Sequence, residues 1–361
     1  MKAYFDNGAT TRVDPLVVKA MTPYFTEHYG NPSSLHSEGQ KAKEAVEKAR
    51  KVIANALGAK PTEIIFTSGG TESDNLAIKG VAQGHIITSK IEHPAVLRTC
   101  ESLDTTYIDV DSDGLIRLDD LKRAIRKDTV LVSIMHANNE VGTVQPIKEI
   151  HSICKKHNIL FHTDAVQSFT KEPLSAKDAD MISLSAHKIH GPKGVGALYV
   201  REGIKLQSLL KGGKHEQGLR AGTENVPGIV GFAKAVELTK KPSKAIRDYI
   251  IKELLKIKGS RLNGHPIKRL CNNINISFDK VEGESILLHL NAKGISVSTG
   301  SACSSKSLKP SHVLTAMGLR PEQSHGTVRI TTSKYTTKTE AEYLVKNLKE
   351  IIKNLREMSP V

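Results

Sequence analysis

Long apolar runs are missing from this 361-residue chain, and none approaches the roughly 18 residues that a membrane-spanning helix needs. The first residues, Met1 to Asp6, also lack the apolar segment of a signal peptide. We therefore expect a cytoplasmic protein without a membrane partner.

Cysteine is scarce and its spacing does not suggest a metal site. The four cysteines lie at positions 100, 154, 271 and 303, and no two of them form a CxxC pair. Zinc ribbons and local cluster-binding motifs are therefore unsupported. Cys100, Cys154 and Cys271 are interpreted as small buried hydrophobic residues.

Aromatic residues are also few, at 4% of the chain, whereas positive charge is abundant. The 52 Lys and Arg residues exceed the 38 Asp and Glu residues, which gives a formal net charge of +14. This excess favours acidic partners, either RNA or acidic proteins. Because the basic residues are spread out and form no cluster with aromatic residues, we do not expect a dedicated nucleic-acid-binding domain.

Apolar strands and amphipathic helices are predicted to alternate through the first two thirds of the chain. Strands are expected at 63–67, 85–89, 105–110, 129–135, 159–163, 180–184 and 195–200. Helices are expected at 15–28, 37–57, 72–80, 94–102, 117–126, 146–157 and 226–239. This alternation predicts an α/β fold whose mostly parallel sheet of seven strands is covered by helices on both faces.

A change in composition near Lys240 to Lys244 predicts a second unit. Helices are expected beyond it at 244–258, 283–293 and 339–357, and strands at 273–278 and 294–298. We predict a large domain over residues 15–243. A smaller α+β domain would consist of an extended arm, residues 1–14, together with residues 244–361.

Two polar residues lie where successive buried strands are predicted to end. Asp164 follows the apolar stretch that begins at Leu160, and Lys188 follows the stretch 180–187. A lysine that forms a Schiff base and a carboxylate that keeps a pyridine nitrogen protonated are the pair that pyridoxal phosphate chemistry requires. The alternatives are an aspartate that caps the next helix and a lysine on the surface.

Residues near this pair are candidates for phosphate contacts. Gly69, Gly70 and Thr71 open a predicted helix, where backbone N–H groups favour a phosphate, although a capped turn is the alternative. Ser185 and His187 can reach a phosphate from the flank of the lysine.

Three further residues are candidates for contacts with the rest of a cofactor. Gln167 can donate to a ring oxygen, and Asn139 follows a predicted strand where ligands collect, unless it only forms a turn. His93 can stack on an aromatic cofactor and accept a proton, although a lone histidine is more often structural.

Cys303 differs from the other cysteines because it lies in a stretch of small and polar residues, 298–306, next to a lysine. Such surroundings suit a reactive thiolate better than a core thiol. The alternative is an incidental cysteine in a loop.

Taken in order, these stretches resemble the cysteine desulfurases of the NifS/IscS type, in the class V aminotransferase group of fold-type I pyridoxal phosphate enzymes. The resemblance runs almost end to end. The matching stretches are 4–11, 30–36, 67–72, 136–142, 162–168, 185–188, 218–225 and the loop that contains Cys303.

The resemblance implies a role for each candidate residue. Lys188 would form the Schiff base, Asp164 would bind the pyridine nitrogen and His93 would stack on the ring. Contacts to the phenolic oxygen and to substrate are implied for Gln167 and Asn139, and phosphate contacts for Gly70, Thr71, Ser185 and His187. Thr223 would reach the phosphate from the other subunit of a homodimer, Arg329 would bind the substrate carboxylate, and Cys303 would accept the sulfur.

The implied activity is the removal of sulfur from L-cysteine, which yields L-alanine and a Cys303 persulfide. The sulfur would pass to an acceptor scaffold protein for iron–sulfur cluster assembly, to tRNA thiolation through a relay, or to both. No resident metal is expected, although Cys303 could ligate a transferred cluster. The alternatives are a selenocysteine lyase, an aminotransferase for small amino acids, and a non-catalytic subunit.

Three residues, Lys214, Gln217 and Lys334, depart from the pattern of the family. These departures leave details of substrate and partner contacts open.

Overall fold

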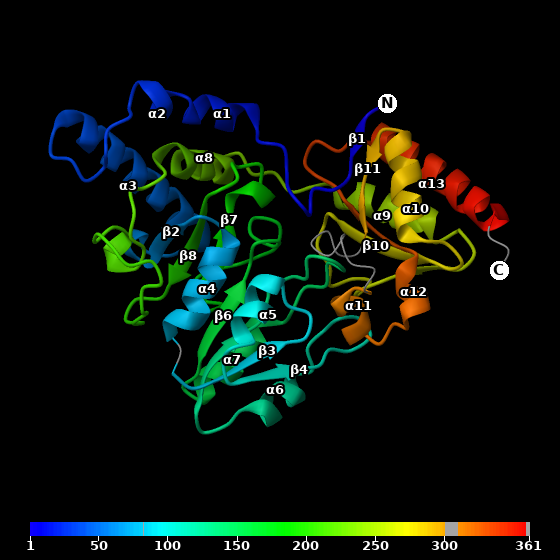
Figure 1. Cartoon of the computed structure of the whole chain (residues 1–361), viewed down its shortest axis with the longest axis horizontal. Coiled ribbons are helices and arrows are strands. Elements are labelled where there is room, and N and C mark those ends of the chain that lie inside the picture. The colour runs from blue at the N-terminus through cyan, green and yellow to red at the C-terminus, as the bar shows by residue number, and fades with distance from the viewer. Residues whose placement is uncertain (82, 300–309, 359–361) are drawn as a thin grey trace.

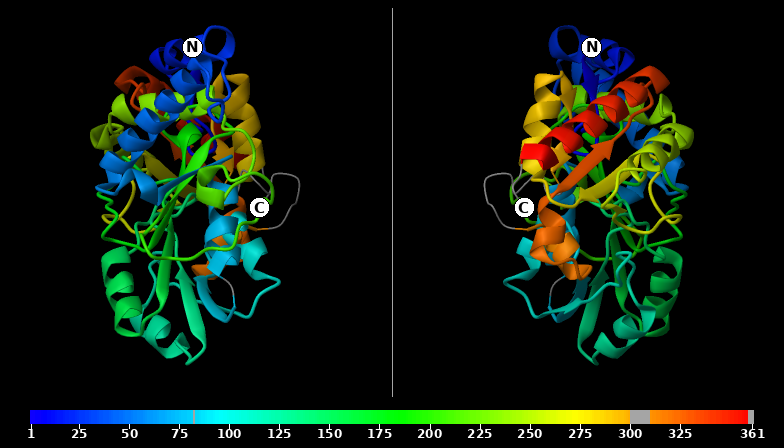
Figure 2. Two further views of the ribbon diagram at one scale, coloured as in Figure 1. Left: turned by 90° about the vertical axis from the view of Figure 1, so that its left-hand side faces the viewer. Right: turned by 90° about the vertical axis from the view of Figure 1, so that its right-hand side faces the viewer.

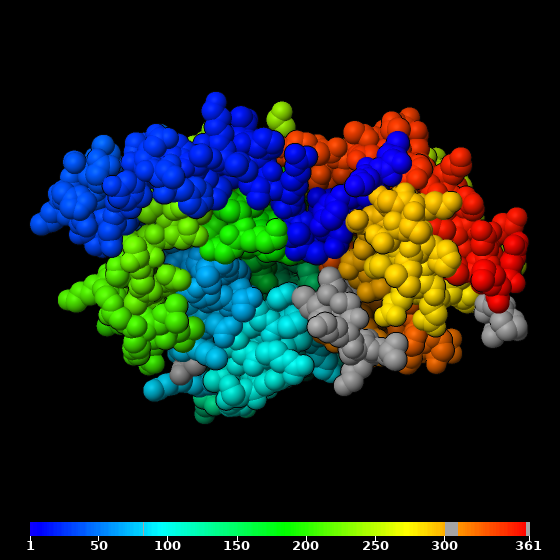
Figure 3. Space-filling view, turned by 45° about the horizontal axis from the view of Figure 1, so that its top comes forward, coloured from blue at the N-terminus to red at the C-terminus, as the bar shows by residue number. Residues whose placement is uncertain are grey.

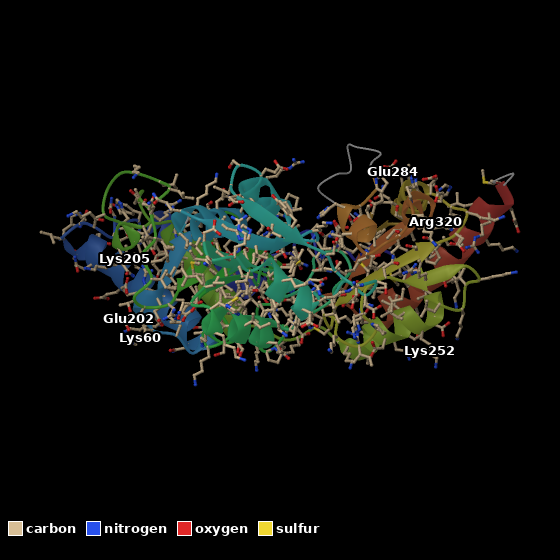
Figure 4. All side chains as sticks on the ribbon, turned by 90° about the horizontal axis from the view of Figure 1, so that it is seen from below. Lys60, Glu202, Lys205, Lys252, Glu284 and Arg320 are labelled. Atoms are coloured by element: carbon tan, nitrogen blue, oxygen red, sulfur yellow. The ribbon has the colours of Figure 1, made fainter. Side chains whose placement is uncertain are left out.

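The computed structural model describes residues 1–81, 83–299 and 310–358, and in it the chain folds into two halves that lie side by side (Figure 1). Both ends of the described chain lie on the smaller half. Charged side chains such as Lys60 and Glu202 project from the outer end of the larger half (Figure 4).

Seven strands form one sheet in the larger half. They are β2 (Ile64–Thr67), β3 (His85–Ser89), β4 (Thr105–Ile108), β5 (Thr129–Ser133), β6 (Leu160–Asp164), β7 (Met181–Ser185) and β8 (Gly196–Val200). Their order is β2-β8-β7-β6-β5-β3-β4. Strand β8 runs antiparallel to both of its neighbours, and all other neighbouring pairs are parallel. The predicted α/β fold with a mostly parallel sheet is confirmed.

Helices cover both faces of this sheet, as the side views show (Figure 2). They are α3 (Ser37–Leu57), α4 (Gly70–Val81), α5 (Pro94–Cys100), α6 (Leu118–Ala124), α7 (Ile147–Lys156) and α8 (Val226–Glu237). Because successive strand residues point to opposite faces, Leu198 and Val200 join one apolar cluster while Ala197 and Tyr199 join the other. Buried residues on both faces explain why the strands contain nearly continuous apolar runs.

The helix predicted over 15–28 is two short helices, α1 (Pro15–Met21) and α2 (Pro23–Thr26). Pro23 has no N–H to donate back along α1, so the first helix ends before it. Asp14 caps α1 through a hydrogen bond from the Leu16 N–H, and α1 packs on α8.

The smaller half contains an antiparallel sheet in the order β12-β13-β10-β9. Its strands are β9 (Ser260–Leu262), β10 (Asn273–Phe278), β12 (Ser298–Thr299) and β13 (Thr327–Thr331), and its helices are α9 (Lys244–Leu254), α10 (Gly283–Ala292), α12 (Pro321–His325) and α13 (Lys338–Met358). The sequence did not predict β9 and β13. The strand predicted at 294–298 is divided into β12 and β11 (Ile295–Ser296), and β11 pairs with β1 (Ala3–Tyr4) of the arm.

Each half has its own apolar core. The core of the smaller half includes Ala3 and Phe5 of the arm together with residues from α9, β10 and α13. Helix α11 (His312–Ala316) lies in the part of the sequence that otherwise forms the smaller half. Its residues Val313 and Leu314 nevertheless belong to the core of the larger half. In the space-filling view the arm lies across the seam between the two halves (Figure 3).

The helices within the described ranges include none with both the length and the apolar character of a membrane span.

Candidate active site

Asp164 and Lys188 are positioned by two neighbouring parallel strands. Asp164 is the last residue of β6 and pairs in register with Ser183 of β7, and Lys188 ends the short 3-10 helix η2 (Ala186–Lys188) that follows β7. Burial raises the pKa of Asp164, whereas the charges of His93 and Lys188 lower it. Asp164 and Lys188 therefore lie at or just after the ends of neighbouring parallel strands, at the edge of the sheet where ligands of α/β proteins bind.

The N-terminal arm forms one wall of this region. Lys188 Nζ donates to the carbonyl oxygens of Gly8 and Ala9, at 2.7 Å each. Gln167, which is almost fully buried, donates from Nε2 to the same Gly8 oxygen at 2.9 Å. The arm thus brings together Gln167, which follows β6, and Lys188, which follows β7.

His93 is held at the start of α5, where Nδ1 accepts a hydrogen bond from the Ala95 N–H at 3.1 Å. Burial lowers its pKa and the charge of Lys188 lowers it further, whereas Asp164 raises it. A neutral imidazole with an apolar ring face suits both stacking on an aromatic ring and acceptance of a proton.

The proposed phosphate contacts gather around the first turn of α4. This helix begins at Gly70, and a Cβ on that residue would lie 2.6 Å from Val166 Cγ2, so a larger residue would fill the space there. A Cβ on Gly196 would lie 2.7 Å from the Gly69 Cα, and Gly196 pairs with Ser185, so the loop adjoins the end of β7. The first N–H groups of a twelve-residue helix are suited to an anion at this point.

Two side chains at this end of the sheet are uncharged polar donors or acceptors. His187 Nδ1 lies 3.1 Å from Thr10 Oγ1, and burial lowers its pKa to about 4. Thr71 is exposed in the first turn of α4. A helix N-terminus, hydroxyl groups and a neutral imidazole form a donor set that fits the phosphate of pyridoxal phosphate.

Arg329 lies in β13 of the smaller half and its side chain is buried. Nη2 pairs with Asp6 Oδ1 at 3.0 Å, and Nη1 donates to the backbone oxygen of Asn139 at 3.2 Å. The Nε atom is buried and has no hydrogen-bond partner among the described residues. A buried guanidinium with a donor still available can bind a carboxylate.

Two carboxyl groups of this site were missed by the sequence prediction. Asp6 is the counterion of Arg329, and Glu140 is buried next to Asn139, where its Oε2 accepts a hydrogen bond from Ser311 Oγ at 2.5 Å. Burial raises the pKa of Glu140 to about 7, and the charge of Arg329 opposes that change. Arg329 is remote from Asp6 in the sequence, and Ser311 is remote from Glu140. The only local indication of a site residue was the position of Glu140 shortly after a predicted strand.

One predicted site residue is not brought together with the others, and another lies outside the described part of the chain. Thr223 is exposed in the loop before α8, and within the described ranges no hydrogen bond joins it to the remaining candidates. Cys303 lies outside the described residues.

The residues that depart from the family pattern have structural contacts. Lys334 Nζ pairs with Asp14 Oδ2 at 2.7 Å and donates to the Leu238 oxygen, so it connects the two halves. Gln217 Nε2 donates to the Thr62 oxygen, and Lys214 lines a cavity of about 660 Å³ beside it.

The sequence profile described as aminotransferase class-V matches residues 3–344. The chain belongs to the class-V aminotransferase family. Among members of this family it is 52% identical to the cysteine desulfurase IscS of Methanosarcina thermophila, over 99% of this chain and 94% of the relative. It is also 52% identical to cysteine desulfurase IscS of Dictyoglomus turgidum, over 99% of this chain and 96% of the relative.

Solved structures of this class-V aminotransferase fold agree with that assignment. A NifS-like protein superposes with a TM-score of 0.92 at 41% identity, over 98% of this chain and all of the other. A structure described as SspA in complex with cysteine has a TM-score of 0.85 at 41% identity, over 93% of this chain and all of the other. The resemblance to NifS/IscS-type enzymes and the fold that it implies are confirmed.

Proposed function

We propose that this class-V aminotransferase is a pyridoxal phosphate-dependent cysteine desulfurase, which converts L-cysteine to L-alanine and leaves the sulfur as a persulfide on Cys303. The observation that carries the proposal is that Lys188 Nζ and Gln167 Nε2 both donate to the Gly8 oxygen, at the sheet edge where β6 ends with Asp164. The identity of 52% with cysteine desulfurases over nearly the whole chain supports the choice of reaction.

The residues at this edge would hold the cofactor. Lys188 would bind it covalently, Asp164 would pair with the pyridine nitrogen, His93 would lie over the ring and Gln167 would contact the ring oxygen. Phosphate contacts are proposed for Gly70, Thr71, Ser185 and His187, and for Thr223 of the partner subunit in a homodimer. When bound, pyridoxal phosphate supplies an electron sink for the substrate Cα.

The protein side chains would orient the substrate and move protons. Arg329, with Asn139 beside it, would bind the carboxylate of L-cysteine through charge-assisted hydrogen bonds. Lys188 would remove the Cα proton, and neutral His93 would accept the thiol proton. A carboxylate fixed on Arg329 limits the orientations of Cα, which favours proton transfer at that atom.

The final step would be carried out by Cys303. Its thiolate forms an S–S bond with the substrate sulfur while the bond between Cβ and sulfur breaks. The electron pair of that bond stays with the substrate, which would take up a proton at Cβ, regain the Cα proton from Lys188 and leave as alanine. The persulfide on Cys303 then keeps the sulfur that L-cysteine has lost.

Further parts of the proposal concern partners and organisation. The sulfur would pass in the cytoplasm to a scaffold protein for iron–sulfur cluster assembly, to tRNA thiolation through a relay, or to both, and Cys303 could ligate a transferred cluster. The divided apolar core supports a large domain of residues 15–243 and a small domain of residues 1–14 and 244–361, with α11 packed on the large domain.

The proposal is tested by incubating the purified protein, loaded with pyridoxal phosphate, with L-cysteine and a thiol reductant. Equal amounts of alanine and sulfide are expected. Lys188→Ala should abolish both products, whereas Lys205→Ala, at the outer surface of the large half (Figure 4), should retain them. Cys303→Ser should form no persulfide. A keto acid in place of alanine would identify an aminotransferase, and full activity of Lys188→Ala would refute the mechanism.

A further inference from the structure

A small cavity of about 20 Å³ lies between the two halves, and Lys188 is one of the residues that line it. The arm contributes Asn7, the segment before β10 contributes Asn272, and the segment after β13 contributes Thr332. This volume is sufficient for a water molecule. The cavity therefore adjoins the lysine proposed to hold the cofactor, and parts of the chain that are remote in sequence build it.

Two side chains of the smaller half bring unsatisfied polar atoms to this cavity. Asn272 Oδ1 and Thr332 Oγ1 are buried and have no hydrogen-bond partner among the described residues. The Asn272 amide has a defined orientation, because Nδ2 donates to the Thr332 backbone oxygen at 3.2 Å. A buried carbonyl oxygen needs a donor, so these atoms favour water, which can donate, over an anion, which cannot.

Lys171 lines the same cavity from the larger half, and its side chain is buried. Nζ donates to the Gln167 backbone oxygen at 2.8 Å. Gln167 Nε2 in turn donates to the Gly8 oxygen, which also accepts from Lys188 Nζ. Burial lowers the pKa of Lys171 to about 8, so the side chain still carries a positive charge at neutral pH. Gln167 and the arm therefore connect this cation to Lys188.

The backbone that borders the cavity is strained at two positions. Thr170 has a φ of +66° and His190 has a φ of +70°, and both residues line the cavity. A β-branched residue such as threonine rarely adopts this left-handed conformation. Thr170 directly precedes Lys171, so the fold maintains an unfavourable conformation next to the buried lysine. Strain of this kind is concentrated at functional sites.

The groups around Lys188 have opposing effects on the protonation of its amine. The Gly8 and Ala9 oxygens accept from Nζ, and the carboxyl group of Asp164 lies at the end of the neighbouring strand. These groups favour the ammonium form, and positive charges oppose them. The other titratable residues around the amine are His93 at the start of α5, His187 in η2, and the cavity-lining residues Lys171, His190, Lys240 and Lys334.

Most of these groups contribute little positive charge. Burial lowers the pKa of all three histidines, so they are uncharged at neutral pH. Lys334 pairs with Asp14, and Lys240 is exposed to solvent. Among the described residues that line the cavity, Lys171 is the buried cation without a carboxylate partner. Its charge is therefore the least screened of the set.

We propose that Lys171 is a positioning residue for Lys188, which orders Gln167 and the arm through hydrogen bonds and, with a water molecule bound in the cavity, keeps a positive charge near the Lys188 amine. This inference rests on the proposed function, because it concerns the lysine that would bind the cofactor. A neighbouring cation favours the neutral, nucleophilic form of an amine. The water would accept a hydrogen bond from the Lys171 ammonium group and donate one to Asn272 Oδ1, which solvates the buried charge.

The decisive variant is Lys171→Gln, which retains a donor for the Gln167 oxygen and removes the charge. Lys171→Arg retains the charge. Lys205→Met is the matched control, because it removes one positive charge from the exposed outer surface of the larger half (Figure 4). Brief labelling of the full-length, cofactor-free proteins with acetic anhydride between pH 6 and pH 10, followed by mass spectrometry, measures the neutral fraction of the Lys188 amine.

In Lys171→Gln we expect the apparent pKa of Lys188 to rise by about one unit, so that labelling at pH 7 slows about tenfold. Uptake of pyridoxal phosphate, followed by absorbance, should slow by a similar factor, because it also requires the neutral amine. Lys171→Arg and Lys205→Met should be labelled and take up the cofactor at rates close to that of the wild type. A high-resolution crystal structure should show the water within hydrogen-bond distance of Asn272 Oδ1.

An unchanged apparent pKa of Lys188 in Lys171→Gln would overturn the inference, as would a cavity without water in the crystal structure. If Lys171→Gln does not fold, Lys171→Arg decides: a wild-type pKa of Lys188 supports the role of the charge, and an increase of about one unit contradicts it. The labelling needs neither cofactor nor turnover. Wild-type protein that makes neither alanine nor sulfide would refute the proposed function, whereas the labelling would still decide the role of Lys171.

Discussion

Glu92 lies beside the proposed stacking residue His93 and is expected to make the stability of the protein fall as the pH rises. The side chain is fully buried, and burial raises its pKa from the ordinary 4.5 to about 8. Ser89 Oγ donates to Oε1 at 2.5 Å and the Met135 N–H donates to Oε2 at 2.9 Å, which limits the pKa increase. The folded protein therefore retains a proton on Glu92 that the unfolded chain releases.

The magnitude follows from the difference between the two pKa values. Between pH 4.5 and 8 the folded state binds more protons than the unfolded state, so the free energy of unfolding decreases with pH. Each pKa unit corresponds to about 1.4 kcal/mol, so a pKa of about 8 costs about 5 kcal/mol once the carboxyl is ionised in both states. This cost is comparable to the whole net stability of many domains, which is about 5–15 kcal/mol.

Glu92→Gln removes the titration and keeps the hydrogen bonds. The glutamine oxygen can accept from the Met135 N–H, and its amide can donate to Ser89 Oγ, so Ser89 keeps a hydrogen-bond partner. We expect the variant to exceed the wild type in stability by about 1 kcal/mol at pH 5 and by about 4 kcal/mol at pH 8. Urea unfolding of both proteins at pH 5, 6, 7 and 8 measures this difference.

Glu202→Gln provides the control, because Glu202 is exposed and pairs with exposed Lys60 at 2.6 Å (Figure 4). Its stability should stay within about 1 kcal/mol of the wild type at every pH. A Glu92→Gln advantage that does not grow between pH 5 and pH 8 would refute the reasoning, since Glu92 would then be ionised in the folded protein.

Three other predictions concern individual residues and their contacts. Asp6→Asn should destabilise the substrate-free protein by about 1–3 kcal/mol, because Arg329 loses its counterion, and L-cysteine should raise the melting temperature of the variant more than that of the wild type. Gly142→Ala should cost about 1–3 kcal/mol in urea unfolding, because φ is +80° and the new Cβ would lie 2.7 Å from Asn273 Oδ1; an unchanged midpoint would contradict this. Burial alone would raise the pKa of Asp14, but hydrogen bonds from a lysine, a tyrosine and a backbone N–H lower it to about 2. The ionised Asp14 carboxylate therefore stabilises the fold fully above about pH 4, and this stabilisation is lost as the pH falls toward 2. In Asp14→Asn the free energy of unfolding should consequently decrease less between pH 4 and pH 2 than it does in the wild type.

The sequence predicted the larger half well because its signals are local. Strands buried on both faces appear as apolar runs, and the polar residue that ends each run lies at the carboxyl edge of the sheet. Asp164 and Lys188 were found in this way, and the structure places them at the ends of the neighbouring strands β6 and β7, on one edge of the sheet. Their catalytic roles stay predictions.

The smaller half was predicted less completely because its signals are weak or remote. Strand β9 has three residues, and β13 carries the buried Arg329 among threonines, so neither has a clear apolar pattern. Helix α11 is too short for a periodic signal, and its packing on the larger half depends on tertiary contacts. The contacts of Asp6 with Arg329 and of Glu140 with Ser311 span 323 and 171 residues, and no local pattern indicates such pairs.

The contact between Asp6 and Arg329 also affects when the site can be completed during synthesis. The ribosome releases Asp6 first and Arg329 323 residues later, a delay on the order of tens of seconds at common rates of translation. The sheet of the larger half is fully synthesised before then, because its last strand, β8, ends at Val200. A nascent chain can therefore fold the sheet that carries Asp164 and Lys188 well before Arg329 is available to pair with Asp6.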